Sequence, residues 1–108
     1  MKDVFVPDHN RLAKALDFAK GTNEILKHSR IFVAWVATGI AAGAYEAAFK
    51  YATQRVQFGK PIAGFQLVQE KLVRMQAQIQ GMILLCHRVS VLHQKGKASM
   101  GLIAMTKA

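Results

Sequence analysis

The sequence predicts an all-α fold, a long antiparallel helical hairpin followed by the start of a third helix. The composition is rich in helix formers, because 52% of the 108 residues are hydrophobic, 8% are aromatic and only two are proline. Apolar residues recur at helical spacing over two long stretches, about residues 24–56 and 65–94. Between them, Gly59 tolerates a positive φ and Pro61 lacks an N–H, so the pattern breaks and the chain turns back.

The first 23 residues differ from the rest of the chain. Val4-Phe5-Val6-Pro7 is β-prone and ends at a proline, so it looks like the tail of a strand whose sheet lies elsewhere. Residues 12–16 are compatible with a short helix. We therefore predict the end of a β-domain and a linker over residues 1–23, and a partial helical bundle domain over residues 24–108.

The first long helix is predicted to begin at an N-cap, Thr22 or Asn23, with Glu24 in its first turn, and to end near Val56. It is apolar on nearly every side over residues 31–43, which is typical of a central, buried helix. That apolar run is about fifteen residues, short of the roughly 20 needed to span a bilayer, so no membrane span is expected. Its expected inward seam is Ile31, Trp35, Thr38, Ala42, Tyr45, Phe49 and Ala52.

The second helix has a more regular seam, and a third helix is predicted over residues 98–108. Lys95-Gly96-Lys97 separates the two. Two long helices and part of a third do not close a four-helix bundle, so we expect a second copy or further chain to cover their remaining apolar faces. The predicted seam of the second helix is Val68, Leu72, Met75, Ile79, Met82, Cys86, Val89 and His93.

The net charge of +9 predicts an anionic partner, which could be nucleic acid, an acidic membrane surface or a phosphorylated small molecule. The alternative is a solvated basic surface, or an imbalance offset by acidic regions elsewhere. The one cysteine, Cys86, lies in the apolar seam and is expected to be a core residue. An intracellular reducing compartment, such as a bacterial cytoplasm, a mitochondrion or a peroxisome, is its natural setting.

The residues alone indicate no catalytic centre. Histidine, cysteine and acidic residues do not occur at metal-ligand spacing, no pair of carboxylates is placed for acid–base work, and there is no phosphate-binding glycine loop. His93 is expected to be a packed histidine and not a metal ligand. We therefore expect neither catalytic residues nor a metal site in this chain.

The turn between the two helices carries the candidate binding residues. Arg55 offers a planar donor fork suited to phosphate, and Phe58 offers a ring for a flat heterocycle. Gln57 and Gln66 are neutral donors and acceptors, and the second helix begins close to Gln66 with free backbone N–H groups. The alternative is that these polar residues only solvate a helix hairpin.

At this turn the sequence resembles the C-terminal helical domain of the acyl-CoA dehydrogenase and acyl-CoA oxidase flavoproteins. Residues 51–61 fit the family pattern Arg-x-x-Phe-Gly-x-Pro, and residues 65–72 supply the glutamine that follows in the next helix. Residues 29–35 look like the start of the preceding family helix, and residues 3–7 like the last strand of its middle β-domain. The nearest branch is that of glutaryl-CoA dehydrogenase and short-chain acyl-CoA oxidase.

The resemblance implies specific roles. In the family, this domain is a four-helix bundle that forms a dimer-of-dimers tetramer. Arg55, Gln57 and Phe58 would contact the pyrophosphate and adenine end of an FAD held mainly by a neighbouring subunit, and Gln66 would join them. Arg30 aligns with an arginine that helps bind the acyl-CoA substrate.

The family reaction oxidises an acyl-CoA thioester across its α and β carbons, with a glutamate as base and the flavin as hydride acceptor. In the family, the motif that carries this glutamate lies beyond the third helix of the bundle. This chain ends at Ala108, before any such motif, so the chain alone is expected to be inactive and could form a dimer.

Two alternatives belong to other functional classes. The first is a non-enzymatic helical module that self-associates through its apolar faces and needs no cofactor. The second is a basic nucleic-acid-binding hairpin, which is less favoured because the positive residues are spread out and lack interleaved aromatic residues.

Overall fold

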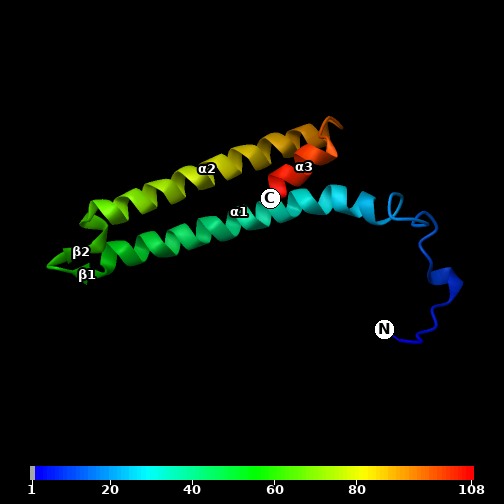
Figure 1. Cartoon of the computed structure of the whole chain (residues 1–108), viewed down its shortest axis with the longest axis horizontal. Helices are drawn as coiled ribbons and strands as arrows, with labels where there is room; N and C mark the ends of the chain where they lie inside the picture. Colours follow the sequence, from blue (N-terminus) through cyan, green and yellow to red (C-terminus); the bar gives the residue numbers. More distant parts are fainter. Residues whose placement is uncertain (1) are drawn as a thin grey trace.

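The structure is a computed structural model that describes residues 2–108, and it is built almost entirely of helices (Figure 1). The predicted all-α hairpin with a third helix is confirmed. Two 3₁₀ turns and two very short strands complete the fold. In chain order the elements are η1 (Asp8–Asn10), α1 (Thr22–Gln54), β1 (Val56–Gln57), β2 (Lys60–Pro61), η2 (Ile62–Gly64), α2 (Gln66–Gln94) and α3 (Met100–Lys107).

The helices form one layer. α1 and α2 run antiparallel along most of the molecule, and α3 folds back between them at the end away from the turn (Figure 1). The described residues measure 70 × 38 × 16 Å along their principal axes. Since one helix with its side chains is about 10–12 Å across, the thickness of 16 Å leaves no room for a second layer.

The inward face of α2 is the predicted one. Its buried residues are Ile79, Cys86 and Val89, spaced by seven and three positions. The other members of the predicted seam are all at least half-buried: Val68, Leu72, Met75, Met82 and His93.

The inward face of α1 is the predicted one only in part. The expected seam residues that are buried or half-buried are Ile31, Thr38, Tyr45 and Ala52. Trp35, Ala42 and Phe49 were expected in the seam, but all three are exposed. Small residues take the central positions, because α2 can approach α1 closely only where side chains are short. The buried residues of α1 are Ile31, Ala34, Thr38 and Ala52.

Polar side chains form contacts between α1 and α2 where the two helices pack closely. The Trp35 indole Nε1–H donates a hydrogen bond to Ser90 Oγ at 3.0 Å from beside the seam. Inside the seam, the Thr38 hydroxyl donates to the carbonyl of Ala34 at 2.9 Å and lies 3.5 Å from Cys86 Sγ. A hydroxyl at a buried position is therefore satisfied by its own helix.

Outside the seam α1 is open, so the expectation of a central helix buried on all sides is not met within the described chain. Phe32 is 76% exposed and Ile40 is 69% exposed, because nothing in this single layer covers the outer side of α1. α1 is also long and apolar enough to cross a membrane by length and composition, with a mean hydropathy of 1.4 in its most apolar stretch. A core helix awaiting further packing passes the same test.

Both ends of α1 differ slightly from the prediction. The N-cap position is Gly21 and not Thr22 or Asn23, and no side chain caps it. Instead the backbone N–H of Asn23 donates to the carbonyl of Phe18 at 2.9 Å. α1 ends at Gln54, two residues before Val56, because Val56 pairs with β2 in a small hairpin.

The N-terminal segment forms less regular structure than expected. Residues 4–7 are in no strand, since the described residues include no second strand beside them to pair with. The short helix expected over residues 12–16 is wrong, and a 3₁₀ turn over Asp8–Asn10 occurs instead. The division of the chain at residue 24 into linker and bundle remains a prediction.

α3 is held by one small apolar cluster, in which Ile103 packs with Ile31 of α1 and Val89 of α2. Its start is capped by Ser99, whose Oγ accepts a hydrogen bond from the N–H of Leu102 at 3.2 Å. Ile103 is therefore the main anchor that joins the third helix to the hairpin.

We predict that Ile103→Ala lowers the free energy of unfolding by about 2–5 kcal/mol, because it empties a filled site in the only cluster that touches all three helices of the described chain. Met105→Ala, at an exposed position of the same helix, is the matched control and should cost well under half as much. Chemical denaturation followed by circular dichroism measures both. Equal costs for the two changes would contradict the docking of α3 described above.

Candidate functional site

The turn at the end of the hairpin is a two-residue connection between β1 and β2. Val56 pairs with Pro61 and Gln57 with Lys60, leaving Phe58 and Gly59 as the loop. Both loop residues have positive φ, 52° at Phe58 and 79° at Gly59. Two consecutive positive φ values define the type I′ turn, which usually takes Asn-Gly. Gly59 suits this turn, whereas Phe58 is strained in it by about 1–2 kcal/mol.

The backbone of Arg55 joins α1 to this hairpin. Its N–H donates to the carbonyl of Tyr51 at 2.8 Å, and its own carbonyl accepts from the N–H of Ile62 at 2.8 Å. The side chain is exposed at the C-terminus of α1. A cation is favourable there, because the last carbonyls of a helix form the negative end of its dipole.

We call residues 55–66 the tip of the hairpin. Phe58 projects its ring from this tip and is 92% exposed. Its contact is edge-on with the ring of Phe65, with centroids 6.1 Å apart and planes at 85°. The ammonium of Lys60 lies over the ring of Phe65, 4.3 Å from its centroid, and also donates a hydrogen bond to the carbonyl of Gly64 at 3.3 Å. The exposed ring of Phe58 contributes almost no burial free energy, while its positive φ costs backbone strain. A phenylalanine at this position therefore does not stabilise the fold of this chain.

The first turn of α2 lies beside this hairpin and presents backbone donors. Phe65 is the N-cap residue, and no side chain caps the helix. The carbonyl of Phe65 accepts from the N–H groups of Val68 and Gln69, both at 3.0 Å. The N–H groups of Gln66 and Leu67 precede any intrahelical acceptor, so they can bind an anion or water.

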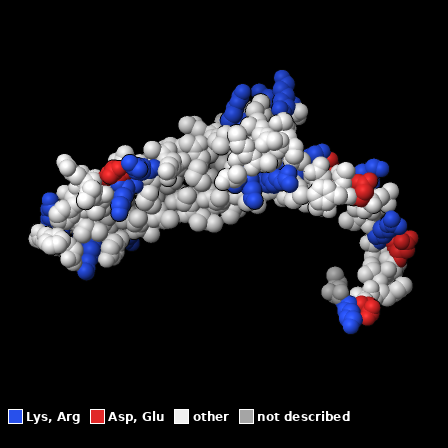
Figure 2. All heavy atoms as spheres, viewed as in Figure 1, with Lys and Arg blue, Asp and Glu red and all other residues white. Residues whose placement is uncertain are grey.

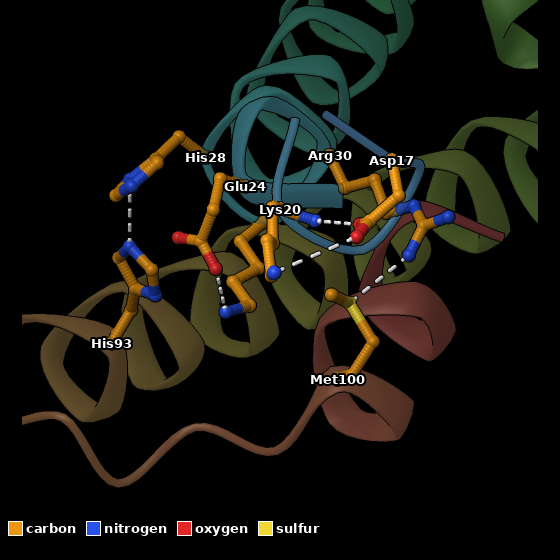
Figure 3. A network of polar contacts seen from close by, with 8 residues as sticks. Asp17, Lys20, Glu24, His28, Arg30, His93 and Met100 are labelled. Atoms are coloured by element: carbon orange, nitrogen blue, oxygen red, sulfur yellow. Dashed lines mark hydrogen bonds and ion pairs between the residues drawn. The ribbon is translucent and has the colours of Figure 1, made fainter. Parts of the chain in front are cut away.

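The structure brings four of the predicted residues to one end of the molecule and leaves the fifth at the other. Arg55, Gln57, Phe58 and Gln66 all belong to the tip (Figure 1). Arg30 lies on α1, 25 positions before Arg55, so it is about 37 Å from the tip along the helix. Its guanidinium Nη1 is 3.0 Å from Met100 Sδ of α3 (Figure 3). Lys and Arg side chains gather towards the two ends of the hairpin, with a largely uncharged surface between them (Figure 2).

Sequence reasoning missed two residues of the tip, Lys60 and Phe65. Their contact depends on the tight β-hairpin, which places Lys60 above a ring five residues later. Helical periodicity gives no sign of such a pair. The one local sign of a tight hairpin was Gly59, which follows the β-prone Val56 by three positions. Because Phe58 and not an asparagine precedes this glycine, the sequence did not suggest a type I′ turn.

Comparison with known proteins identifies the fold. Residues 20–108 match the family model described as the acyl-CoA dehydrogenase C-terminal domain. The chain belongs to the acyl-CoA dehydrogenase family. The matched region includes all three helices and the tip, so the site just described lies in the family domain.

Relatives of known function support the same assignment. The chain is 34% identical over 108 residues to a glutaryl-CoA dehydrogenase of Desulfococcus multivorans, covering 99% of this chain and 28% of that protein. It is 40% identical over 87 residues to a benzylmalonyl-CoA dehydrogenase of Aromatoleum aromaticum, covering 80% and 23%. It is 40% identical over 96 residues to a short-chain-specific acyl-CoA dehydrogenase of Megasphaera elsdenii, covering 89% and 25%.

These relatives include a glutaryl-CoA dehydrogenase, as the resemblance implied. The chain spans about a quarter of the length of the curated relatives it matches.

We predict that Phe58→Asn raises the free energy of unfolding by about 1 kcal/mol, because asparagine adopts positive φ more readily and the exposed ring contributes little burial. Phe5→Asn is the matched control, since Phe5 is also exposed but has no positive φ, and its effect should be close to zero. Denaturant titration compares the two. A clear loss of stability in Phe58→Asn would mean that the contact with Phe65 outweighs the backbone strain.

Proposed function

We propose that this chain provides part of the C-terminal helical bundle of an FAD-dependent acyl-CoA dehydrogenase or oxidase. Its tip would bind the adenosine and pyrophosphate end of FAD. The observation that carries the proposal is Phe58, an exposed ring held in a strained turn three residues after the exposed Arg55. The family is generally FAD-dependent, which supports the choice of ligand.

The tip residues fit the two chemical parts of that ligand. Phe58 presents a flat apolar ring on which an adenine can pack, and stacked aromatic systems gain about 0.5–1.5 kcal/mol beyond burial. Arg55 supplies a planar donor fork for a phosphate oxygen pair. Gln57 can donate to or accept from polar groups of the nucleotide.

Gln66 and the start of α2 add donors for the same anionic group. The N–H groups of the uncapped first turn and the positive end of a 29-residue helix favour a phosphate. Lys60 adds a further positive charge while it steadies Phe65. The tip thus concentrates positive charge and hydrogen-bond donors without any carboxylate of its own.

The rest of the flavin site is expected to come from another subunit. Phe58 is exposed at the far end of the hairpin, and the described residues of this chain form no wall opposite it. An adenine on Phe58 would therefore be enclosed only by a neighbouring chain. When bound, FAD would accept the hydride released from the β carbon of the acyl-CoA.

Arg30 is our proposed substrate contact, directed at the acyl-CoA. It is half-buried between α1 and α3, and its contact with the Met100 sulfur is a weak one that an anionic group can displace. Since Arg30 and the tip are about 37 Å apart along α1, one chain would contribute its substrate contact and its cofactor contact to different active sites.

The uncovered apolar surface supports the oligomerisation that we propose. On α1 the exposed side chains include Phe32, Val36 and Ile40. Beside the tip, an open apolar groove of about 490 Å³ is lined by Tyr45, Phe49 and Leu72 among others. Surfaces of this kind mark protein–protein contacts, and the family is generally oligomeric. A tetramer is the assembly that we propose for the whole enzyme.

A second candidate function rests on the same surface. A helical module that self-associates without a cofactor needs the exposed faces of α1 and α2 and makes no use of Phe58 or Arg55. A dimer of this chain would suffice for it. The two functions therefore differ in what the tip residues contribute.

We predict that Arg55→Ala weakens FAD retention about 10- to 150-fold in the protein purified in its native assembly. This corresponds to the roughly 1.5–3 kcal/mol of a charge-assisted hydrogen bond. Arg74→Ala is the matched control, because it removes the same charge from the exposed side of α2, where Arg74 pairs with Glu70 at 2.7 Å. Flavin released on dilution, measured by fluorescence, reports retention. Unchanged FAD occupancy in Arg55→Ala, or an equal loss in Arg74→Ala, would refute the assignment.

A further inference from the structure

The fold brings together two histidines that are 65 positions apart in the sequence. His93 Nε2 of α2 lies 3.1 Å from His28 Nδ1 of α1 (Figure 3). The rings meet edge to face, with centroids 5.0 Å apart and planes at 81°. This pair is at the end of the hairpin remote from the tip, and neither histidine has a role in the proposed flavin or acyl-CoA contacts.

The separation of the two nitrogens suits shared coordination of one metal ion. Metal–imidazole bonds are about 2.0–2.1 Å long, which separates two ligating nitrogens by about 2.8–3.0 Å at a right angle and about 3.3–3.4 Å at a tetrahedral angle. The observed 3.1 Å lies between these limits. Because the two nitrogens face each other in a hydrogen bond, both rings must turn so that their lone pairs converge on an ion between them.

The surroundings leave the pair open to solvent and supply one nearby carboxylate. Glu24 is one turn before His28 on α1, and it pairs with Lys27 (Figure 3). The hydrogen bond and charge of Lys27 hold the pKa of Glu24 below its ordinary value, and His28 adds a smaller lowering. The carboxylate is thus ionised near neutral pH and offsets the charge of Lys27 beside the pair.

Although the sequence indicated no metal site and a packed His93, we propose that His28 and His93 form an open binding site for one borderline transition-metal dication of the Cu²⁺, Ni²⁺ and Zn²⁺ class. Neutral imidazole is the ligand type that suits these ions, and affinity should follow the order in which Cu²⁺ exceeds Zn²⁺. No group of three histidine, cysteine or acidic side chains converges among residues 2–108, so water completes the coordination.

Metal binding changes the proton arrangement of the pair in a defined way. Without metal, one of the two facing nitrogens carries the hydrogen that joins the rings. With metal, both facing nitrogens offer lone pairs, and that proton moves through solvent to the other nitrogen of its ring. The bound ion then joins α1 to α2 in place of a neutral hydrogen bond, which stabilises the open end of the hairpin.

The test uses the full chain without a histidine tag and titrates it separately with ZnCl₂ and CuCl₂ in a calorimeter. We expect one site per chain, bound more tightly by Cu²⁺. His28→Gln and His93→Gln should each weaken binding at least tenfold, since even loss of a supporting hydrogen bond costs roughly 10- to 100-fold at metal sites. His9→Gln and His87→Gln are the controls, because these histidines lie outside the pair and are exposed.

Binding that persists in either pair variant, or that falls equally in the controls, overturns the proposal. If a glutamine variant does not fold, nuclear magnetic resonance of the unaltered protein decides the matter. Zn²⁺ should then shift the ¹⁵N resonances of His28 Nδ1 and His93 Nε2 and leave those of His9 and His87 in place. Zinc-induced shifts spread over all four histidines, or absent from all of them, count against the site.

Discussion

The two-residue turn at Phe58 and Gly59 fixes how α1 lies against α2. Its positive φ values reverse the chain within two positions, and the bond from the N–H of Ile62 to the carbonyl of Arg55 locks the register. From there, contacts follow in antiparallel order: Trp35 meets Ser90, Thr38 meets Cys86, and His28 meets His93. A turn with one more residue would shift all three of these contacts. The close packing of small side chains at the seam opposes such a shift.

The single layer that this turn produces leaves apolar faces uncovered. A hairpin with one short helix folded back makes a layer 16 Å thick, whose outer faces have no cover among the described residues. Large exposed side chains such as Phe32 and Ile40 leave apolar surface that the proposed assembly would cover. In the assembly that we propose, the strained and exposed Phe58 would gain a contact that the described residues of this chain do not give it.

Helical periodicity predicted the fold well where it depends on one helix at a time. The seam of α2 from Val68 to His93 was predicted in full, and both long helices were predicted to within two residues at each end. The seam of α1 was wrong at Trp35, Ala42 and Phe49, because α1 is apolar on several sides and periodicity cannot tell which side another helix will approach. Pairs across the fold, such as Lys60 with Phe65 and His28 with His93, depend on the turn geometry and gave no local signal. The tip residues were singled out by their chemistry, but their assignment to FAD came from the family resemblance, since an arginine, a phenylalanine and two glutamines are not a distinctive set.

The most direct measurement of the central claim is the native mass of the purified protein together with its visible absorption spectrum. We expect a yellow species, with flavin bound in an assembly of several subunits in which each hairpin tip reaches a neighbouring chain. A colourless species, whether a single chain or a dimer of this chain, that takes up no FAD when the cofactor is added would contradict this expectation. The family membership would then describe ancestry, and the tip would serve only to turn the chain.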